Sequence, residues 1–265
     1  MKIYVAVDME GIGGIIHTSQ LMKGEGMYEE SRRLLTDEVN AVVEGLLQAG
    51  ATEIIVRDVH ATGINFVPDR LHPGASYFMG ATSFKERFPG IDASFDGAFL
   101  IGYHAMAGVA QAVRDHTYSS RSFSSVKLNG RPVGEIGLDG LLLGQYGVPV
   151  LLVTGDDKTC EEAKQELGQG VATYCTKKAW GRHSALMIPP QRVRTEIKEA
   201  IGEAIRNRAE CRPHRIEGPY ELTVQYLSTD LADGRYCDGV QSERLDGLTI
   251  RTKDTDLIRL MSRGI

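Results

Sequence analysis

The chain has 265 residues and a formal net charge of −5 at pH 7, with its basic residues scattered along the sequence. This length suffices for one large domain or two smaller ones, and the charge argues against a nucleic-acid-binding protein, which needs a basic face. No apolar stretch approaches the ~18 residues of a membrane-spanning helix, and the first apolar run breaks at Asp8, too early for a signal peptide. The four cysteines are widely spaced and form no CxxC pair, which is typical of reduced thiols. We therefore expect a cytoplasmic protein without nucleic-acid or membrane partners.

The first predicted element is a strand over residues 2–7, and two carboxylates follow its end. Asp8 and Glu10 lie in the tetrad Asp8-Met9-Glu10-Gly11. Residues two apart on an extended chain share a face, so both acids can serve one cluster. Two acids at a buried strand end repel each other unless a cation neutralises them, which favours metal binding here. The glycine-rich turn that follows lacks the spacing of a dinucleotide-binding fingerprint.

Two more predicted strands end in residues that bind metals. A strand over residues 53–57 leads into Asp58 and His60, and a strand over residues 98–103 leads into His104. The carboxyl ends of parallel strands meet at one edge of a sheet, where ligands bind. This repetition makes a dinuclear metal hydrolase the first hypothesis. The segments between these strands are predicted as a helix, a loop and a short helix, over residues 28–48, 61–75 and 83–88.

Residues 105–121 show little hydrophobic periodicity and contain His116. A long irregular segment directly after a candidate ligand is typical of an active-site loop. An imidazole beside a metal can act as a general acid or base, or donate a hydrogen bond to an oxyanion. From the residues alone, His116 fits this role and an ordinary surface loop equally well.

The rest of the chain changes from alternating strands and helices to a mixture. Asn129-Gly130 predicts a type I′ hairpin turn, and a helix opens at Glu135. A fourth core strand runs over residues 148–153 and ends near Asp156 and Asp157, which we interpret as helix caps. After these, a strand is predicted over residues 171–177 and a helix after Pro189-Pro190. Two further strands, over residues 220–227 and 248–252, precede a short terminal helix. The predicted fold is therefore α/β, a mostly parallel sheet with helices on both faces over residues 1–160, followed by a smaller α+β part over residues 161–265.

Two adjacent metal ions need about five protein ligands and usually a bridging carboxylate. The candidate ligands are Asp8, Glu10, His60, His104 and Glu135. Asp8 is the natural bridge because it follows the first strand directly, whereas Glu135 by itself is an ordinary first-turn acid favoured by the helix dipole. Asp58 is either a further ligand or a partner that holds the imidazole of His60. The other histidines are expected at the surface or without an identifiable partner: His17, His72, His214 and His183.

These motifs together resemble the zinc-dependent D-aminopeptidase family encoded in bacterial dipeptide-transport operons. The order and approximate spacing match over the first ~160 residues, and the resemblance then fades to Arg182 and Ser184-Ala185. One short motif is weak, but five in order are specific. The matching segments are Val7-Asp8-Met9-Glu10-Gly11, Asp58-Val59-His60, Leu100-Ile101-Gly102-Tyr103-His104-Ala105, Asn129-Gly130-Arg131-Pro132-Val133-Gly134-Glu135 and Pro149-Val150-Leu151-Leu152-Val153-Thr154-Gly155-Asp156-Asp157.

The resemblance implies a binuclear zinc aminopeptidase that removes N-terminal residues from short peptides, including peptides or amides that contain D-amino acids. It implies that Asp8 bridges two zinc ions held with Glu10, His60, His104 and Glu135, and that His116 is the catalytic residue near the scissile carbonyl. Two zinc ions lower the pKa of a shared water from ~15.7 towards ~7, which supplies hydroxide. The same ligand set also accepts Mn²⁺ or Co²⁺. The resemblance further implies a homo-oligomer, a ring-stacked decamer around a chamber, in which the C-terminal part assembles subunits and screens substrates.

Three alternatives stay open. A metal-dependent amidase acting on non-peptide amides would need the same ligands. A phosphoesterase is less favoured, because such enzymes usually need a Ser or Thr nucleophile close to the first strand and this chain has Met9 there. A non-catalytic metal-binding α/β module would keep the acids and histidines without turnover. The preference for D-residues, L-residues or glycine depends on loop shapes that the sequence does not reveal.

Overall fold

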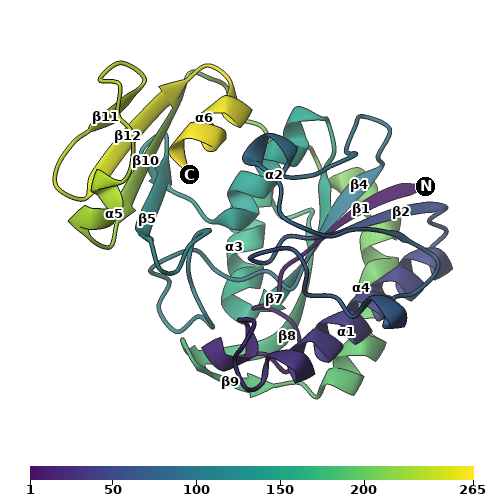
Figure 1. Ribbon diagram of the computed structural model, residues 1–265. Helices are drawn as coiled ribbons and strands as arrows, with labels where there is room; N and C mark the ends of the chain where they lie inside the picture. The colour runs from purple at the N-terminus through teal and green to yellow at the C-terminus, as the bar shows by residue number, and fades with distance from the viewer.

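The computed structural model describes residues 1–265 and contains two β-sheets (Figure 1). The larger sheet has seven strands in the order β3-β2-β1-β4-β7-β8-β9, and all neighbours are parallel except β8 and β9. The smaller sheet has five antiparallel strands in the order β11-β12-β10-β5-β6. The strands of the larger sheet are β1 (Lys2–Val7), β2 (Glu53–Asp58), β3 (Ser76–Phe78), β4 (Gly97–Ile101), β7 (Val150–Asp156), β8 (Ala172–Gly181) and β9 (Ser184–Met187).

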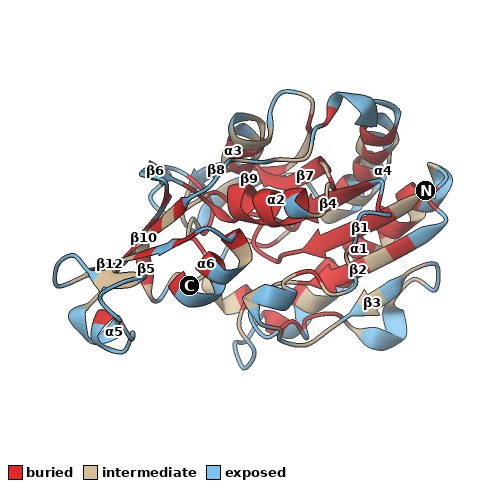
Figure 2. Ribbon diagram, turned by 90° about the horizontal axis from the view of Figure 1, so that it is seen from above, coloured by how far each residue is buried: buried red, intermediate tan, exposed pale blue.

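Helices cover both faces of the larger sheet because its strands alternate between two apolar clusters. Helices α1 (Tyr28–Gln48) and α4 (Pro190–Arg206) pack against each other on one face, and Ile3, Val5 and Val7 of β1 join their cluster. Tyr4 and Ala6 point to the opposite face, towards α2 (Glu135–Gln145), beside which α3 (Asp157–Leu167) lies. The predicted α/β fold, with a mostly parallel sheet between helices, is confirmed. In Figure 2 the central strands and α2 form the buried interior.

The smaller sheet starts from the hairpin predicted at Asn129-Gly130. Both turn residues have positive φ, 49° and 79°, as a type I′ turn requires. Helix α6 packs against this sheet, and in Figure 1 the two stand together at the end of the molecule away from the N-terminus. The elements are β5 (Phe123–Leu128), β6 (Arg131–Pro132), β10 (Tyr220–Tyr226), α5 (Thr229–Asp233), β11 (Ser242–Arg244), β12 (Thr249–Asp254) and α6 (Leu257–Gly264).

The two sheets do not divide the chain at residue 160. Strands β5 and β6 lie before that residue and belong to the smaller sheet, whereas β8 and β9 lie after it and belong to the larger one. The chain therefore leaves the larger sheet and returns to it. The assignment of residues 161–265 to assembly and substrate access stays a prediction.

The register of the parallel strands decides where the candidate ligands meet. Val7 of β1 pairs with Asp58 of β2 on one side and with Ile101 of β4 on the other. Residues that follow these three positions therefore leave the sheet at one edge, beside the N-terminus of α2. The irregular segment predicted before residue 121 is confirmed, and the short helix predicted at 83–88 is a 3₁₀ turn over Phe84–Glu86. None of the helices is long and apolar enough to cross a membrane.

Candidate metal centre

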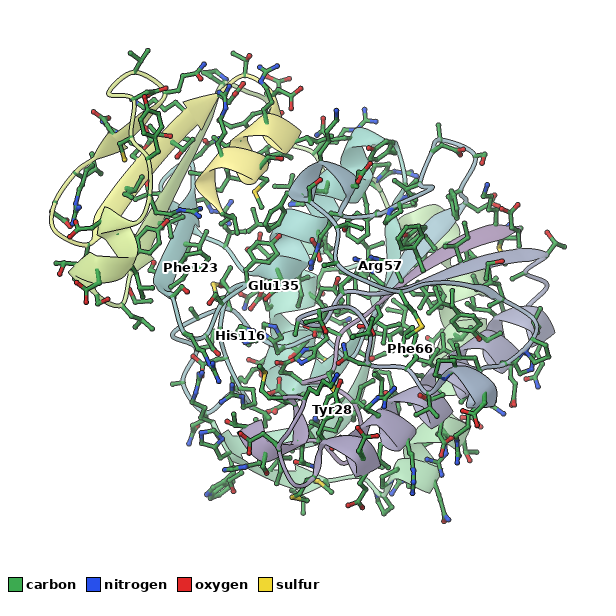
Figure 3. The ribbon with its side chains drawn as sticks, in the orientation of Figure 1. Tyr28, Arg57, Phe66, His116, Phe123 and Glu135 are labelled. Atoms are coloured by element: carbon green, nitrogen blue, oxygen red, sulfur yellow. The ribbon has the colours of Figure 1, made fainter.

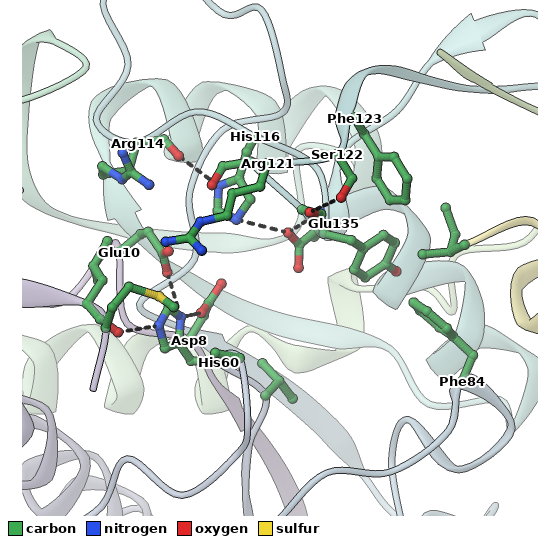
Figure 4. A pocket seen from close by; sticks show the side chains of 18 of the residues that line it. Asp8, Glu10, His60, Phe84, Arg114, His116, Arg121, Ser122, Phe123 and Glu135 are labelled. Atoms are coloured by element: carbon green, nitrogen blue, oxygen red, sulfur yellow. Dashed lines mark hydrogen bonds and ion pairs between the residues drawn. The ribbon is translucent and has the colours of Figure 1, made fainter. Parts of the chain in front are cut away.

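The five predicted metal ligands lie together at the carboxyl edge of the larger sheet. Figure 4 labels Asp8, Glu10, His60 and Glu135, and His104 contacts Asp8 and Glu135. Asp8 and Glu10 follow β1, His60 follows β2 and His104 follows β4. Glu135 is the first residue of α2. All five are buried, with exposed fractions between 1 and 7 %. In Figure 3, Glu135 and His116 lie between Phe123 of β5 and the strands of the larger sheet. The residues are Asp8, Glu10, His60, His104 and Glu135.

Asp8 lies between two sets of side chains. Its Oδ1 is 3.0 Å from His60 Nδ1, which is also 3.1 Å from Glu10 Oε2. Its Oδ2 is 3.3 Å from His104 Nε2, which is also 3.2 Å from Glu135 Oε1. Each oxygen of the Asp8 carboxylate thus faces a different histidine–glutamate pair.

The spacing of these atoms fits ligands of a shared cation. Donor atoms bound at about 2.0–2.2 Å to one tetrahedral ion lie about 3.3 Å from each other, close to the distances within each set. Two of the atoms, Glu10 Oε2 and His104 Nε2, are buried and have no hydrogen-bond partner despite these short distances. Imidazole nitrogens and carboxylate oxygens suit Zn²⁺ and several other divalent ions. The residues therefore could hold two metal ions, one in each set.

Each imidazole near the site has one nitrogen tied to the main chain. His60 Nε2 lies 3.0 Å from the carbonyl of Leu21, and His104 Nδ1 lies 3.0 Å from that of Ala105. A ring that donates one N–H to a carbonyl keeps the other nitrogen bare, as metal-binding histidines do. In both residues the bare nitrogen is the one that faces the carboxylates.

The electrostatics of the site favour a cation between the carboxylates. Burial lowers the pKa of His60, but the facing Glu10 and Asp8 outweigh it and raise the pKa well above its usual value. Burial raises the pKa of Asp8, but His104 and His60 outweigh it and hold that pKa well below its usual range. Positive charge is therefore strongly stabilised at the positions between these groups.

His116 lies beside the second set but is held differently. Its ring stacks on that of His104, with centroids 3.9 Å apart and planes inclined by 12°. Nδ1 lies 2.8 Å from the carbonyl of Arg114, and Nε2 is 3.8 Å from Glu135 Oε1. Burial, followed by the charge of His104, lowers the pKa of His116. The lowered pKa favours the neutral ring, and the contact of Nδ1 with a carbonyl leaves Nε2 as the acceptor.

The loop that carries His116 is fixed to the larger sheet. Asp156 caps α3 by accepting from Thr159 N at 2.8 Å, which confirms its interpretation as a cap. Its other oxygen accepts from Val113 N at 2.7 Å. Arg182 pairs with Asp115 in the same loop. Asp156 thus ends β7, caps α3 and anchors the irregular loop.

Of the two alternatives predicted for Asp58, the contact with the His60 imidazole is wrong. Asp58 Oδ1 accepts from the main-chain N–H of His60 at 3.2 Å, and its Oδ2 accepts from that of Asn65 at 2.6 Å. It therefore shapes the turn after β2, and the Leu21 carbonyl holds the ring instead. His17 is exposed as predicted, and its ring lies 5.0 Å from that of His183.

Sequence reasoning missed a buried lysine below the Glu10 loop. Lys177 of β8 is fully buried, and its Nζ donates to the carbonyls of Glu10, Ile12 and Ile15 at 2.6, 2.8 and 2.5 Å. Gly11 lies within the same loop, where an added Cβ would stand 2.1 Å from the carbonyl oxygen of Tyr103. Glycine is therefore required there. A single lysine in a strand carries no signal that could have identified this contact.

Sequence reasoning also missed the group that positions Glu135. Arg87 Nη2 is 2.9 Å from Asp139 Oδ2 and 3.5 Å from Glu135 Oε2. Tyr103 and Tyr118 donate to Asp139 from two further segments. A buried carboxylate one helical turn after Glu135 was the available signal, because Asp139 faces the same side as Glu135 at a spacing of four residues.

A pocket of about 560 Å³ opens onto both sets of ligands. One wall comes from the segment 118–123, and another comes from the smaller sheet and its helices. This volume suits a small ligand. The residues from the second wall are Tyr226, Leu231, Arg235 and Ile265.

The known proteins that this chain resembles are D-aminopeptidases. The D-aminopeptidase family profile matches residues 1–263. A D-aminopeptidase of Bacillus subtilis (strain 168) is 34 % identical over 235 residues, which cover 88 % of this chain and 84 % of that protein. The solved structure described as the Zn-dependent D-aminopeptidase DppA from Bacillus subtilis, a self-compartmentalizing protease, has a TM-score of 0.92 and 29 % identity, covering 99 % of this chain and 95 % of that chain. The chain therefore belongs to the D-aminopeptidase family and is a peptide-bond hydrolase.

Proposed function

We propose that this protein is a binuclear zinc aminopeptidase that releases N-terminal D-residues from short peptides or amides. The observation that carries the proposal is the position of Asp8, whose two oxygens face separate histidine–glutamate pairs at 3.0 and 3.3 Å. A carboxylate in that position can bridge two ions. We assign Asp8, Glu10 and His60 to one ion and Asp8, His104 and Glu135 to the other. The zinc dependence of the matching solved structure supports zinc as the metal.

We propose that His116 is catalytic and binds no metal. Its ring is nearly parallel to that of His104, so the lone pairs of the two rings lie in separate, stacked planes. A metal ion binds in the plane of an imidazole at about 2.0–2.1 Å, and one ion cannot lie in both planes. This geometry supports ligation by His104 alone.

The mechanism follows from the charges that amide hydrolysis creates. Two zinc ions held by these residues would supply a water of lowered pKa and polarise the scissile carbonyl. His116 accepts a proton at Nε2, because its Nδ1–H is committed to the Arg114 carbonyl and its pKa is lowered by burial. The protonated ring then donates that proton to the departing amine, which must leave as a neutral group.

We further propose that the protein is a cytoplasmic homo-oligomer, with the decamer as the form to test. The matching solved structure is described as a self-compartmentalizing protease, which supports an assembly of copies. Residues 161–265 would contribute to the assembly and to substrate access. Sedimentation velocity of the purified protein gives the number of subunits.

The experiment that tests the site combines metal analysis with kinetics on matched D- and L-aminoacyl amides and dipeptides. We expect about two zinc ions per chain and preferential release of D-residues. His104→Ala should lose metal and activity together, because His104 is a ligand. His116→Ala should keep both metal ions and lose at least about 100-fold in kcat, the usual contribution of a general acid–base.

His72→Ala is the control, since His72 is a partly exposed histidine whose ring accepts only from Gly74 N. It should keep metal and activity. Retention of both by His104→Ala would contradict the metal assignment. Loss of metal in His116→Ala would make that residue a ligand. Full zinc without turnover on any peptide or amide would favour a binding module over an enzyme.

A further inference from the structure

Four arginines line the pocket beside the candidate metal centre, and three of them form no ion pair with a side-chain carboxylate. Arg87 pairs with Asp139, whereas Arg235 Nη2 donates to a main-chain oxygen of Ile265 at 2.5 Å. Arg114 and Arg121 have neither a carboxylate nor a main-chain oxygen as acceptor. These two cationic side chains are therefore the ones that a ligand could engage.

Arg114 is the more unusual of the two, because it is buried. Only 8 % of the residue is exposed, its Nη1 donates to Thr18 Oγ1 at 2.8 Å, and neither Nε nor Nη2 has an acceptor in the chain. Burial, followed by the charge of Arg182, lowers its pKa, and the charges of Glu10 and Asp115 offset only part of that shift. A buried cation without a partner is destabilising, so the environment of Arg114 favours an incoming anion.

The main chain at Arg114 is also held in an uncommon conformation. Its φ is 54°, in the left-handed region that non-glycine residues seldom adopt. Its N–H donates to the Arg182 carbonyl at 3.0 Å, and its own carbonyl accepts from His116 Nδ1. The same residue thus orients the proposed catalytic histidine and presents a guanidinium to the pocket. Such conformations persist where the surrounding structure enforces them, often at functional sites.

We propose that Arg114, together with the exposed Arg121, binds the C-terminal carboxylate of a short peptide substrate; this rests on the proposed aminopeptidase function. The Nε and Nη2 atoms form the edge of a guanidinium that matches the two oxygens of a carboxylate. Nε is buried, so Nη2 is the atom of this edge that can donate to a carboxylate in the conformation present. Arg121 is exposed and, in Figure 4, extends into the pocket.

The acidic ligands Asp8, Glu10 and Glu135 line the same pocket as Arg114 and Arg121. The scissile bond of a substrate must lie at the ions that these acids would hold. A dipeptide carries its carboxylate only one residue beyond that bond, so this carboxylate would lie in the pocket that the two arginines line. Short peptides with a free carboxyl group would therefore bind better than longer or blocked ones.

The test compares D-alanyl-glycine with its C-terminal amide, D-alanyl-glycinamide. The two differ only in the carboxylate. Wild-type enzyme should prefer the free dipeptide by about 10-fold or more in kcat/KM, the worth of a hydrogen bond to a charged group. Arg114→Asn should raise KM for the dipeptide about 10- to 100-fold and leave the amide nearly unchanged. Asparagine suits this position because it tolerates positive φ and keeps the carbonyl that orients His116.

Further variants separate the carboxylate contact from other roles. Arg114→Lys should restore part of the dipeptide preference, because it keeps the charge and loses the fork. Arg121→Gln should lower the ratio of kcat/KM for the dipeptide to kcat/KM for the amide, but by less than Arg114→Asn does. Arg212→Gln is the matched control, since Arg212 is an exposed arginine that does not line the pocket, so the ratio should not change.

Several results would overturn the proposal. An equal loss on both substrates in Arg114→Asn, with zinc content unchanged, would place the arginine at the scissile bond instead. Equal kcat/KM of wild-type enzyme on both substrates would overturn it even if the variant does not fold. Turnover of neither substrate by zinc-loaded wild-type enzyme would refute the aminopeptidase function itself, and this proposal with it.

Discussion

The two sheets of this protein differ in where they place polar residues. In the larger sheet, β1, β2 and β4 end side by side, and buried acids and histidines follow their carboxyl ends. In the smaller sheet, neighbouring strands run in opposite directions, so their ends alternate between two edges. Its contribution to the pocket consists of wall residues such as Tyr226. A parallel sheet gathers distant residues at one edge, whereas an antiparallel one distributes them. The larger sheet thus carries the candidate ligands, and the smaller one lines one wall of the pocket.

The largest effect should come from breaking the buried polar network next to Glu135. This network consists of Arg87, Asp139, Tyr103 and Tyr118. Arg87→Met leaves Asp139 buried without its cation, which should lower the free energy of unfolding by about 3–5 kcal/mol. Because Arg87 also contacts Glu135, zinc affinity should fall about 10- to 100-fold. Urea unfolding and zinc titration measure the two effects.

The control is Arg70→Met, which removes the partner of Asp37 in a solvent-accessible ion pair of 2.7 Å. An exposed pair contributes about 0–1 kcal/mol, so this variant should stay near wild type. Equal free energies of unfolding for the two variants would contradict the stabilising role of the buried network next to Glu135.

A core substitution in the smaller sheet should affect stability without affecting the metal centre. Leu222 of β10 is fully buried, and Leu222→Ala should cost about 2–5 kcal/mol of stability. The folded variant should keep its zinc content and its kcat, because no candidate ligand lies on this sheet. Loss of zinc from protein that is still folded would show that the two sheets do not act separately.

The smallest expected effect is on the pH dependence of the free energy of unfolding. Glu38, on a helix beside the larger sheet, and Asp254, in the smaller sheet, should change it in opposite directions. Burial raises the pKa of Glu38, on α1, from 4.5 to about 7 against the hydrogen bond from Gly13 N. As pH rises, Glu38 loses its proton near pH 4.5 in the unfolded chain but only near pH 7 in the folded protein. The free energy of unfolding should therefore fall as pH rises from about 4.5 to about 7. Glu38→Gln should remove that fall and gain about 1–3 kcal/mol over wild type at pH 8. Urea unfolding of both proteins between pH 5 and 8 measures the difference.

Asp254 at the end of β12 provides the matched contrast. Arg259 lowers its pKa from 3.8 to about 2. The stability that Asp254 contributes should therefore be present above about pH 4 and lost towards pH 2, and Asp254→Asn should remove this dependence. A constant difference between wild type and Glu38→Gln at all pH values would contradict the raised pKa of Glu38.

Much of the fold was predictable because local patterns and tertiary packing agree in it. The helix over residues 28–48 and the hairpin at Asn129-Gly130 have the predicted bounds and turn type. The short edge strands β3, β9 and β11 were not predicted, because three or four residues at a sheet edge carry little periodicity. The return of the chain to the larger sheet through β8 and β9 depends on long-range packing that no local pattern encodes.

The sequence by itself determined which residue types follow the strands, and with them the candidates Asp8, Glu10, His60 and His104, whereas Glu135 opens a helix and was a candidate because of the family resemblance. A strand end and a residue type are local properties, so they can be recognised without knowing what lies opposite. Only the tertiary structure decided how these residues pair, which oxygen of Asp8 faces which histidine, and that a main-chain carbonyl holds His60 in place of Asp58. It alone revealed Lys177 beneath the Glu10 loop and Arg114 without a counter-ion. The burial and the partners of a charged side chain are set by segments distant in sequence, and those contacts exist only once the chain has folded.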